Sequence, residues 1–140
     1  EYFRQKMSVV KDQINEIEDN IQGYTKLRII ANRYNTSVTM KDYFRELVSN
    51  PEKLPDADLF VHTCVPSLKE MTTSYRKMSE QPVKGCETYQ TLQELAEKIE
   101  LTCEKLEEDY LHFQEDRIQD SEAEMDYVTR KILEKGKGAK

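Results

Sequence analysis

The sequence has 140 residues, of which 37% are hydrophobic and 34% charged, and it contains only four glycines and four prolines. A chain of this length suits one domain, and this balance is typical of long, solvated helices that bury narrow seams. The composition disfavours a sheet protein and a disordered tail, and the absence of an apolar run of about 18 residues predicts no membrane span.

The net charge of −6 is unevenly distributed along the chain. Residues 1–86 hold twelve acids and thirteen bases, whereas residues 87–140 hold fifteen acids and eight bases. Such an acidic second part repels a phosphate backbone, so we expect no nucleic-acid partner. An anionic membrane also needs a basic surface, so the charge counts against a membrane partner without excluding one.

Residues 1–34 are predicted to form one long helix. Apolar side chains recur there at spacings of three and four, which places them on one helix face. The stripe consists of Phe3, Met7, Val10, Ile14, Ile17, Ile21 and Tyr24. Gly23 lies inside this helix and costs about 1 kcal/mol relative to Ala, so it indicates a close helix contact or a bend.

Two shorter helices are expected next, separated by turns. The residues Asn35-Thr36-Ser37 favour a turn. Thr39 lies three residues before Asp42, a spacing that resembles a capping box at the start of a helix over 40–49. Residues 50–57 contain two prolines and are predicted to form a loop. A helix over 57–80 follows, in which Pro66 either belongs to the first turn or marks a kink.

The last helix is predicted over 87–134, nearly 50 residues without Gly or Pro, or roughly 70 Å. It carries two apolar seams whose register slips by one residue between Phe113 and Ile118. The first seam is Leu92, Ala96, Ile99, Cys103, Leu106, Tyr110 and Phe113, and the second is Ile118, Met125, Val128 and Ile132. Residues 136–140 are expected to be a frayed tail.

These helices predict an all-α fold, an elongated antiparallel bundle with coiled-coil seams formed by residues 1–135 as a single module. The short turn at 81–85 should fold helix 57–80 back onto 87–107. The N-terminal half of the first helix should lie against 113–132 and leave a poorly buried two-helix end. We expect a partner to bind there, through Phe3, Met7, Val10, Ile14, Ile118, Met125, Val128 and Ile132.

No residue pattern predicts catalysis. Asp109 and His112 lie three apart on a helix, as in di-iron bundles, but the remaining ligands of such a site are missing and a solvated face is the better interpretation. His62 and Cys64 point to different sides of their helix, and Cys64 lies on a predicted seam. We therefore expect no enzyme, no catalytic residue, no cofactor, no metal and no small-molecule substrate.

Asp116, Asp120 and Glu124 are spaced by four and line one helix face. Without a Gly-bearing loop of oxygen ligands, they could hold a cation such as Ca²⁺ only loosely. Such a row of acids more often forms a solvent-exposed helix face, and it could also bind a basic partner.

Three functional hypotheses remain. The first is a non-enzymatic protein–protein interaction module, a scaffold or adaptor subunit that binds itself or another protein in a reducing, cytoplasmic compartment. The second is a membrane-trafficking or BAR-like module, because long antiparallel helices are typical of such modules. The segment VVKDQINEIEDNI, residues 9–21, also resembles the start of syntaxin regulatory bundles. The third is a secreted helical ligand or carrier, which the glycosylation tripeptide at Asn35 favours and three unpaired cysteines disfavour.

Overall fold

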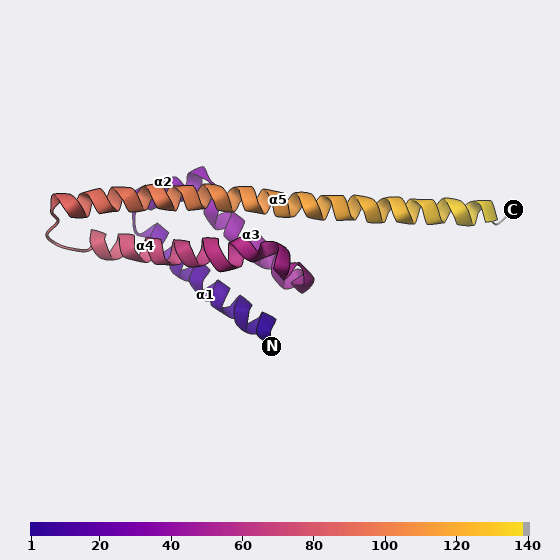
Figure 1. Cartoon of the computed structure of the whole chain (residues 1–140), viewed down its shortest axis with the longest axis horizontal. Coiled ribbons are helices and arrows are strands. Elements are labelled where there is room, and N and C mark those ends of the chain that lie inside the picture. The colour runs from indigo at the N-terminus through magenta and orange to yellow at the C-terminus, as the bar shows by residue number, and fades with distance from the viewer. Residues whose placement is uncertain (139–140) are drawn as a thin grey trace. The chain divides into compact units, whose positions relative to one another are not determined.

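The computed structural model describes the backbone of residues 1–138 and the side chains of residues 1–136, and it confirms the all-α fold. The described residues contain no strand and no helix long and apolar enough to cross a membrane. The elements are α1 (Tyr2–Gln22), α2 (Thr25–Arg33), α3 (Thr36–Ser49), the 3₁₀ helix η1 (Pro51–Ala57), the π-helical turn η2 (Phe60–Cys64), α4 (Val65–Ser79) and α5 (Cys86–Gly138) (Figure 1).

The chain forms two compact units, whereas the sequence predicted one module over 1–135. The first unit is Glu1–Tyr110 and contains α1 to α4 together with the beginning of α5. The second unit starts at Leu111 and consists of the remainder of α5.

The predicted helix over 1–34 is interrupted by a single extended residue. Gly23 keeps helical backbone angles (φ −74°, ψ −16°), whereas Tyr24 is extended (φ −136°, ψ 126°), and α2 begins at Thr25. Contacts to α4 hold Tyr24 in place: its ring meets Tyr75 edge-on at 5.7 Å, and its hydroxyl donates to the carbonyl of Arg76 at 3.4 Å. The glycine therefore marks a bend, but tertiary contacts of the next residue fix it.

Helix α3 starts four residues earlier than predicted. Asn35 adopts the left-handed conformation (φ 54°), which Asn tolerates better than most residues, and it joins α2 to α3 without a longer loop. Its side-chain amide donates to Glu107 Oε2 at 3.0 Å. Thr39 is buried inside α3, so the predicted cap formed by Thr39 and Asp42 is wrong.

The proline-containing segments are more helical than expected. The predicted loop over 50–57 is largely the 3₁₀ helix η1. Pro66 lies in the first turn of α4, directly after the π-helical turn η2. Because proline has no N–H and its ring crowds the carbonyl four residues earlier, the widened turn accommodates it within an otherwise continuous helical run.

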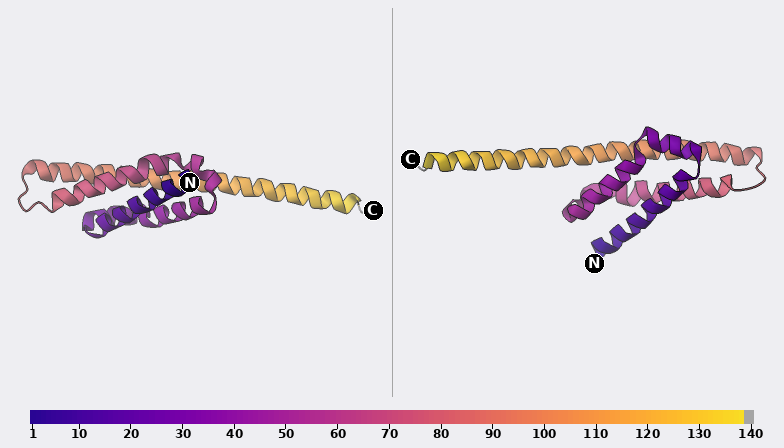
Figure 2. Two further views of the ribbon diagram at one scale, coloured as in Figure 1. Left: turned by 90° about the horizontal axis from the view of Figure 1, so that it is seen from below. Right: turned by 180° about the vertical axis from the view of Figure 1, so that it is seen from behind.

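Apolar seams meet in the first unit as the spacing predicted. Helix α1 packs on α4 and α3, and α4 runs back along the beginning of α5 (Figures 1 and 2), which confirms the predicted fold-back. The largest buried side chains come from α1, α2, α3, η2, α4 and the beginning of α5: Tyr43, Phe60, Ile17, Leu27, Ile30, Met40, Leu47, Leu68, Ile99, Leu106, Val10 and Val61.

Tyr43 connects three elements at the centre of this core. Its fully buried ring stacks on Phe60 at a centroid distance of 4.1 Å and lies 5.0 Å from the ring of Tyr110. Its hydroxyl donates to Asp109 Oδ2 at 2.8 Å. Burial, and after it the hydrogen bond to Asp109, raises the pKa of Tyr43 far above its usual value, so the phenol stays protonated.

A buried polar network crosses the contact between α1 and α4. The Asn20 amide nitrogen donates to the hydroxyls of Thr72 and Thr73, each at 3.1 Å, and its oxygen accepts from Arg76 at 2.8 Å. Thr73 in turn donates to Glu16 at 3.2 Å. This satisfied network fixes the register of the two helices, because sliding either one would leave Asn20 unpaired in the core.

The second unit is the continuation of α5. All described side chains from residue 115 to residue 136 are exposed. The helix passes the predicted end at residue 134 and reaches Gly138, so Gly136 does not end it. The remainder of the predicted frayed tail, residues 139–140, lies outside the described residues.

Candidate functional site

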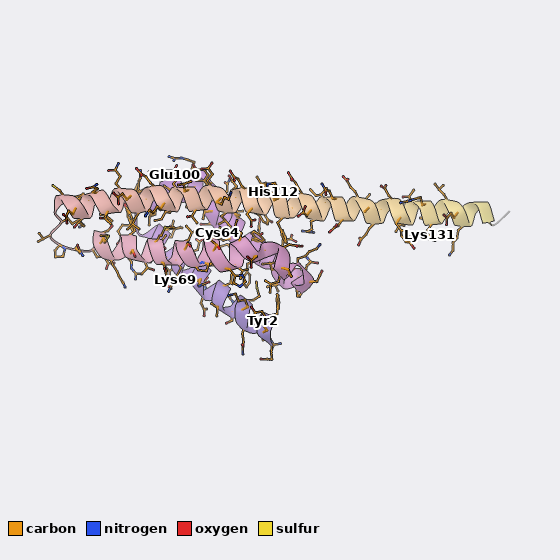
Figure 3. The ribbon with its side chains drawn as sticks, viewed as in Figure 1. Tyr2, Cys64, Lys69, Glu100, His112 and Lys131 are labelled. Atoms are coloured by element: carbon orange, nitrogen blue, oxygen red, sulfur yellow. The ribbon has the colours of Figure 1, made fainter. Side chains whose placement is uncertain are left out.

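The second unit displays an apolar stripe that no described side chain covers. Its members are exposed by more than half: Ile118 by 58%, Met125 by 67%, Val128 by 53% and Ile132 by 64%. Spacings of seven, three and four place them on one helix face, as in the seam of a coiled coil. We name Ile118, Met125, Val128 and Ile132 the α5 stripe; Figure 3 shows the side chains along this helix.

The other half of the predicted contact surface is placed differently. Met7, Val10 and Ile14 are at most 5% exposed, because α3 and α4 of the same unit pack on α1. Only Phe3, near the start of α1, remains half-buried. The expectation that Met7, Val10 and Ile14 bind a second molecule is therefore corrected, because these side chains belong to the chain's own core; for Phe3 the expectation stays a prediction.

Charged residues occupy the other faces of the helix that carries the α5 stripe. Asp116, Asp120 and Glu124 are exposed on the helix, and the described residues contain no group of three or more His, Cys, Asp or Glu side chains able to hold a metal ion. Lys131 lies 3.7 Å from Glu134 and above the ring of Tyr127. Exposed ion pairs within one helix are weak, so Lys131 and Glu134 are able to form ion pairs with another molecule instead.

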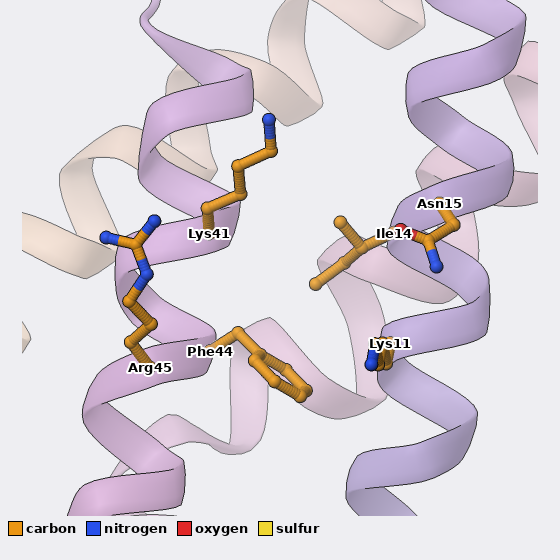
Figure 4. Close-up of a pocket in the computed structure, with 6 residues that line it drawn as sticks. All are labelled: Lys11, Ile14, Asn15, Lys41, Phe44 and Arg45. Carbon is orange, nitrogen blue, oxygen red and sulfur yellow. The ribbon is translucent and has the colours of Figure 1, made fainter.

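A second candidate surface is a cationic cleft of about 270 Å³ in the first unit. Helix α3 supplies Lys41, Phe44 and Arg45, and helix α1 supplies Lys11, Ile14 and Asn15 (Figure 4). The Phe44 ring points across the cleft toward α1. The spacing of four between Lys41 and Arg45 puts both bases on one side of α3.

The cleft combines positive charge with an apolar floor. Within the described residues, Lys11 and Lys41 make no ion pair, while Arg45 pairs with Asp42 at 3.2 Å on the exposed surface. Lys and Arg side chains bind phosphate and sulfate groups, and an aromatic ring offers a flat apolar contact. This lining suits a small anion that carries an aromatic group. Nothing in the sequence showed that α1 would bring Lys11 opposite Lys41 and Arg45.

The structure does not bring the predicted chemistry-bearing residues together. Asp109 accepts the hydrogen bond from Tyr43, so the interpretation of Asp109 as part of a solvated face is corrected. His112 is exposed and lies 3.7 Å from Glu115, and His62 pairs with Asp58 at 2.8 Å. These contacts are local pairs on the helix surface.

The cysteines divide into one exposed and two buried thiols. Cys64 and Cys103 lie in the core of the first unit, whereas Cys86 is exposed at the start of α5, and all three are free. Burial raises the pKa of both buried thiols to about 11. Because the thiolate is the reactive form, both are unreactive core residues at neutral pH.

Fold and surface together define an all-α bundle protein with an uncovered helical stripe and a small cationic cleft. A family model described as 5-bromo-4-chloroindolyl phosphate hydrolysis protein matches residues 1–128. The match covers most of the chain, so this chain belongs to that family. No curated protein and no solved structure matches it. The matched family differs from the syntaxins that residues 9–21 resemble.

Proposed function

We propose that this chain is a non-enzymatic interaction module that joins a protein partner through the α5 stripe. The observation that carries the proposal is the exposure of all four stripe residues, whose spacing places them on one face of α5. Contiguous apolar surface on a helix is a recurrent mode of protein recognition. The three free cysteines support a reducing compartment such as the cytoplasm.

The family description names the hydrolysis of an aryl phosphate. We propose that this chain contributes to that hydrolysis as a non-enzymatic assembly module, while a separate hydrolase cleaves the ester. The described surfaces support this division of labour, because the cleft offers cations and an aromatic ring, and its lining contains no carboxylate, imidazole or thiol. Such groups commonly act as nucleophile or general base in phosphate ester hydrolysis.

Polar substitution of the stripe tests the proposal. Cells that produce the full chain with Ile118→Ser, Met125→Ser and Val128→Ser should release less indigo dye from 5-bromo-4-chloroindolyl phosphate than cells with the unmodified chain. Leu133→Ser is the matched control, because Leu133 is exposed by 61% on the same helix but lies outside the stripe. Equal dye release from the triple variant and the control would place the contact elsewhere.

A second measurement separates an adaptor from an enzyme. The purified chain alone should leave the ester intact at every concentration tested. Saturable cleavage by the purified chain that tracks its concentration would overturn the non-enzymatic assignment.

A second candidate function is binding of a phosphate monoester in the cationic cleft. It is favoured by the three bases around Phe44 and by the aryl phosphate in the family description. Calorimetric titration with 5-bromo-4-chloroindolyl phosphate should show binding that Lys41→Ala weakens severalfold. Lys26→Ala, an exposed α2 substitution outside the cleft, is the control. Equal heats for both variants would remove this candidate.

A further inference from the structure

The charges around the α5 stripe are arranged so that the segment complements itself when reversed. Residues 115–126 carry six acids and one base, whereas residues 127–136 carry three bases and one acid. A second copy laid antiparallel on the stripe brings each acidic half opposite a basic half. A parallel copy brings acid against acid over the first half.

The stripe also supplies a core for such a pair. In heptad terms Ile118, Met125 and Ile132 occupy one seam position, and Ser121 and Val128 occupy the other. Two antiparallel helices alternate these positions across the seam. Met125 therefore packs on Val128 of the second copy at the centre, and the two-fold symmetry repeats this contact. Ile132 then covers Ser121 of the second copy.

The same register aligns opposite charges beside the seam. Glu124 and Lys131 each precede a seam residue, Met125 and Ile132, and antiparallel pairing places Glu124 next to Lys131 of the second copy. Symmetry repeats the pair. Lys131 is exposed, and its contacts with Glu134 and with the Tyr127 ring are weak surface contacts, so it is available for this pair.

We propose that the partner of the α5 stripe is a second copy of this chain, bound as an antiparallel two-stranded coiled coil centred on Met125 and Val128. This inference rests on the proposed function, because it names the occupant of the same surface. The result is an isologous dimer in which each chain contributes the same residues.

Sedimentation equilibrium of the full chain over a concentration series tests this pairing. The unmodified chain should reach twice its mass of 16.5 kDa. Met125→Ser should raise the dimer dissociation constant by about 100-fold, because two central side chains lose their burial. Leu133→Ser, an exposed apolar residue outside the seam, should leave the constant within about threefold of the unmodified value.

Charge exchange tests the orientation. Glu124→Lys alone places Lys opposite Lys, and Lys131→Glu alone places Glu opposite Glu, so each variant should dimerise about tenfold more weakly at low salt. Mixing the two single variants should restore a mixed dimer, because every pair is again of opposite sign. In a parallel coiled coil these two positions do not face each other, and mixing would restore nothing, which would overturn the proposed pairing.

The outcomes also separate this inference from the proposed function. A chain that stays monomeric at all concentrations overturns the self-pairing but leaves the stripe as a surface for a different protein. If Ile118→Ser, Met125→Ser and Val128→Ser together change neither the mass nor the dye release, both the pairing and the proposed function fail.

Discussion

Replacement of Tyr43 by Phe removes one hydroxyl from the centre of the first unit and keeps the ring. The stacking on Phe60 and the contact with Tyr110 stay possible, because neither uses the hydroxyl. What is lost is the 2.8 Å hydrogen bond to Asp109, which joins α3 to α5.

The expected cost follows from the charge of the acceptor. A hydrogen bond to a charged group contributes about 1.5–3 kcal/mol, and the partial exposure of Asp109 puts this one near the lower end, at about 1.5–2 kcal/mol. In a chain of this size each 1 kcal/mol lowers the melting temperature by roughly 3–5 °C. Tyr43→Phe should therefore lower the melting temperature by roughly 5–10 °C.

Thermal and urea unfolding followed by far-ultraviolet circular dichroism measures this effect. Tyr127→Phe is the matched control, because Tyr127 is 59% exposed. The free energy of unfolding of this variant should stay within about 0.5 kcal/mol of that of the unmodified chain. A double-mutant cycle with Asp109→Asn should show clear coupling. Unchanged unfolding of Tyr43→Phe, or strictly additive effects, would refute the role given to this hydrogen bond.

Three further results are expected. Gly23→Ala should be neutral or stabilise by up to about 1 kcal/mol in urea unfolding, because Gly23 has helical angles and an added Cβ meets its nearest atom at 3.6 Å; a clear loss of stability would contradict this. Native chain at pH 8 should react rapidly with a thiol reagent at Cys86 alone, and fast labelling of Cys64 or Cys103 would show that the core opens. Burial raises the pKa of Cys64 and Cys103 from 9.0 to about 11. Between these values the unfolded chain loses the thiol protons and the folded chain keeps them, so the free energy of unfolding has its full value below pH 9 and falls as the pH rises toward 11. Unfolding free energies from pH 8 to 11 should show this decline, and Cys103→Ala should make it shallower; an equally steep decline in Cys103→Ala would contradict the assignment.

Apolar spacing predicted which faces are buried in the first unit but not what covers them. Ile14 and Ile118 each belong to an apolar stripe with spacings of three, four or seven. Only the folded chain shows that α3 and α4 pack on the helix of Ile14, whereas Ile118 stays exposed. Periodicity reports that a face is apolar, and the choice between an internal and an external partner depends on tertiary arrangement.

The departures from the predicted elements have local physical causes. Tyr24 leaves the helix because its ring and hydroxyl bind α4, a contact that no local propensity contains. The turn between α2 and α3 is limited to Tyr34 and Asn35, because Asn35 adopts the left-handed conformation. The hydrogen-bond partners of Asn20 lie more than 50 positions away in sequence, so the buried network could not be predicted from residue spacing.

The candidate surfaces were predicted unequally. All four residues of the α5 stripe were proposed from sequence and are exposed in the structure, although their role as a contact surface stays a prediction. The cationic cleft was not foreseen, because it needs Lys11 of α1 opposite Lys41 of α3. A helix pairing has to be known before residues 30 positions apart can be assigned to one site.

Hydrogen–deuterium exchange of residues 115–136 over a concentration series tests most directly whether the α5 stripe is an interface. At low concentration the amides of this uncovered helix should exchange much faster than those of residues 96–106 in the same helix, because few packed contacts oppose its opening. As the concentration rises, or when a partner is added, amides around Met125 and Val128 should become protected. Exchange of this segment that stays equally fast with every partner and at every concentration would contradict the account.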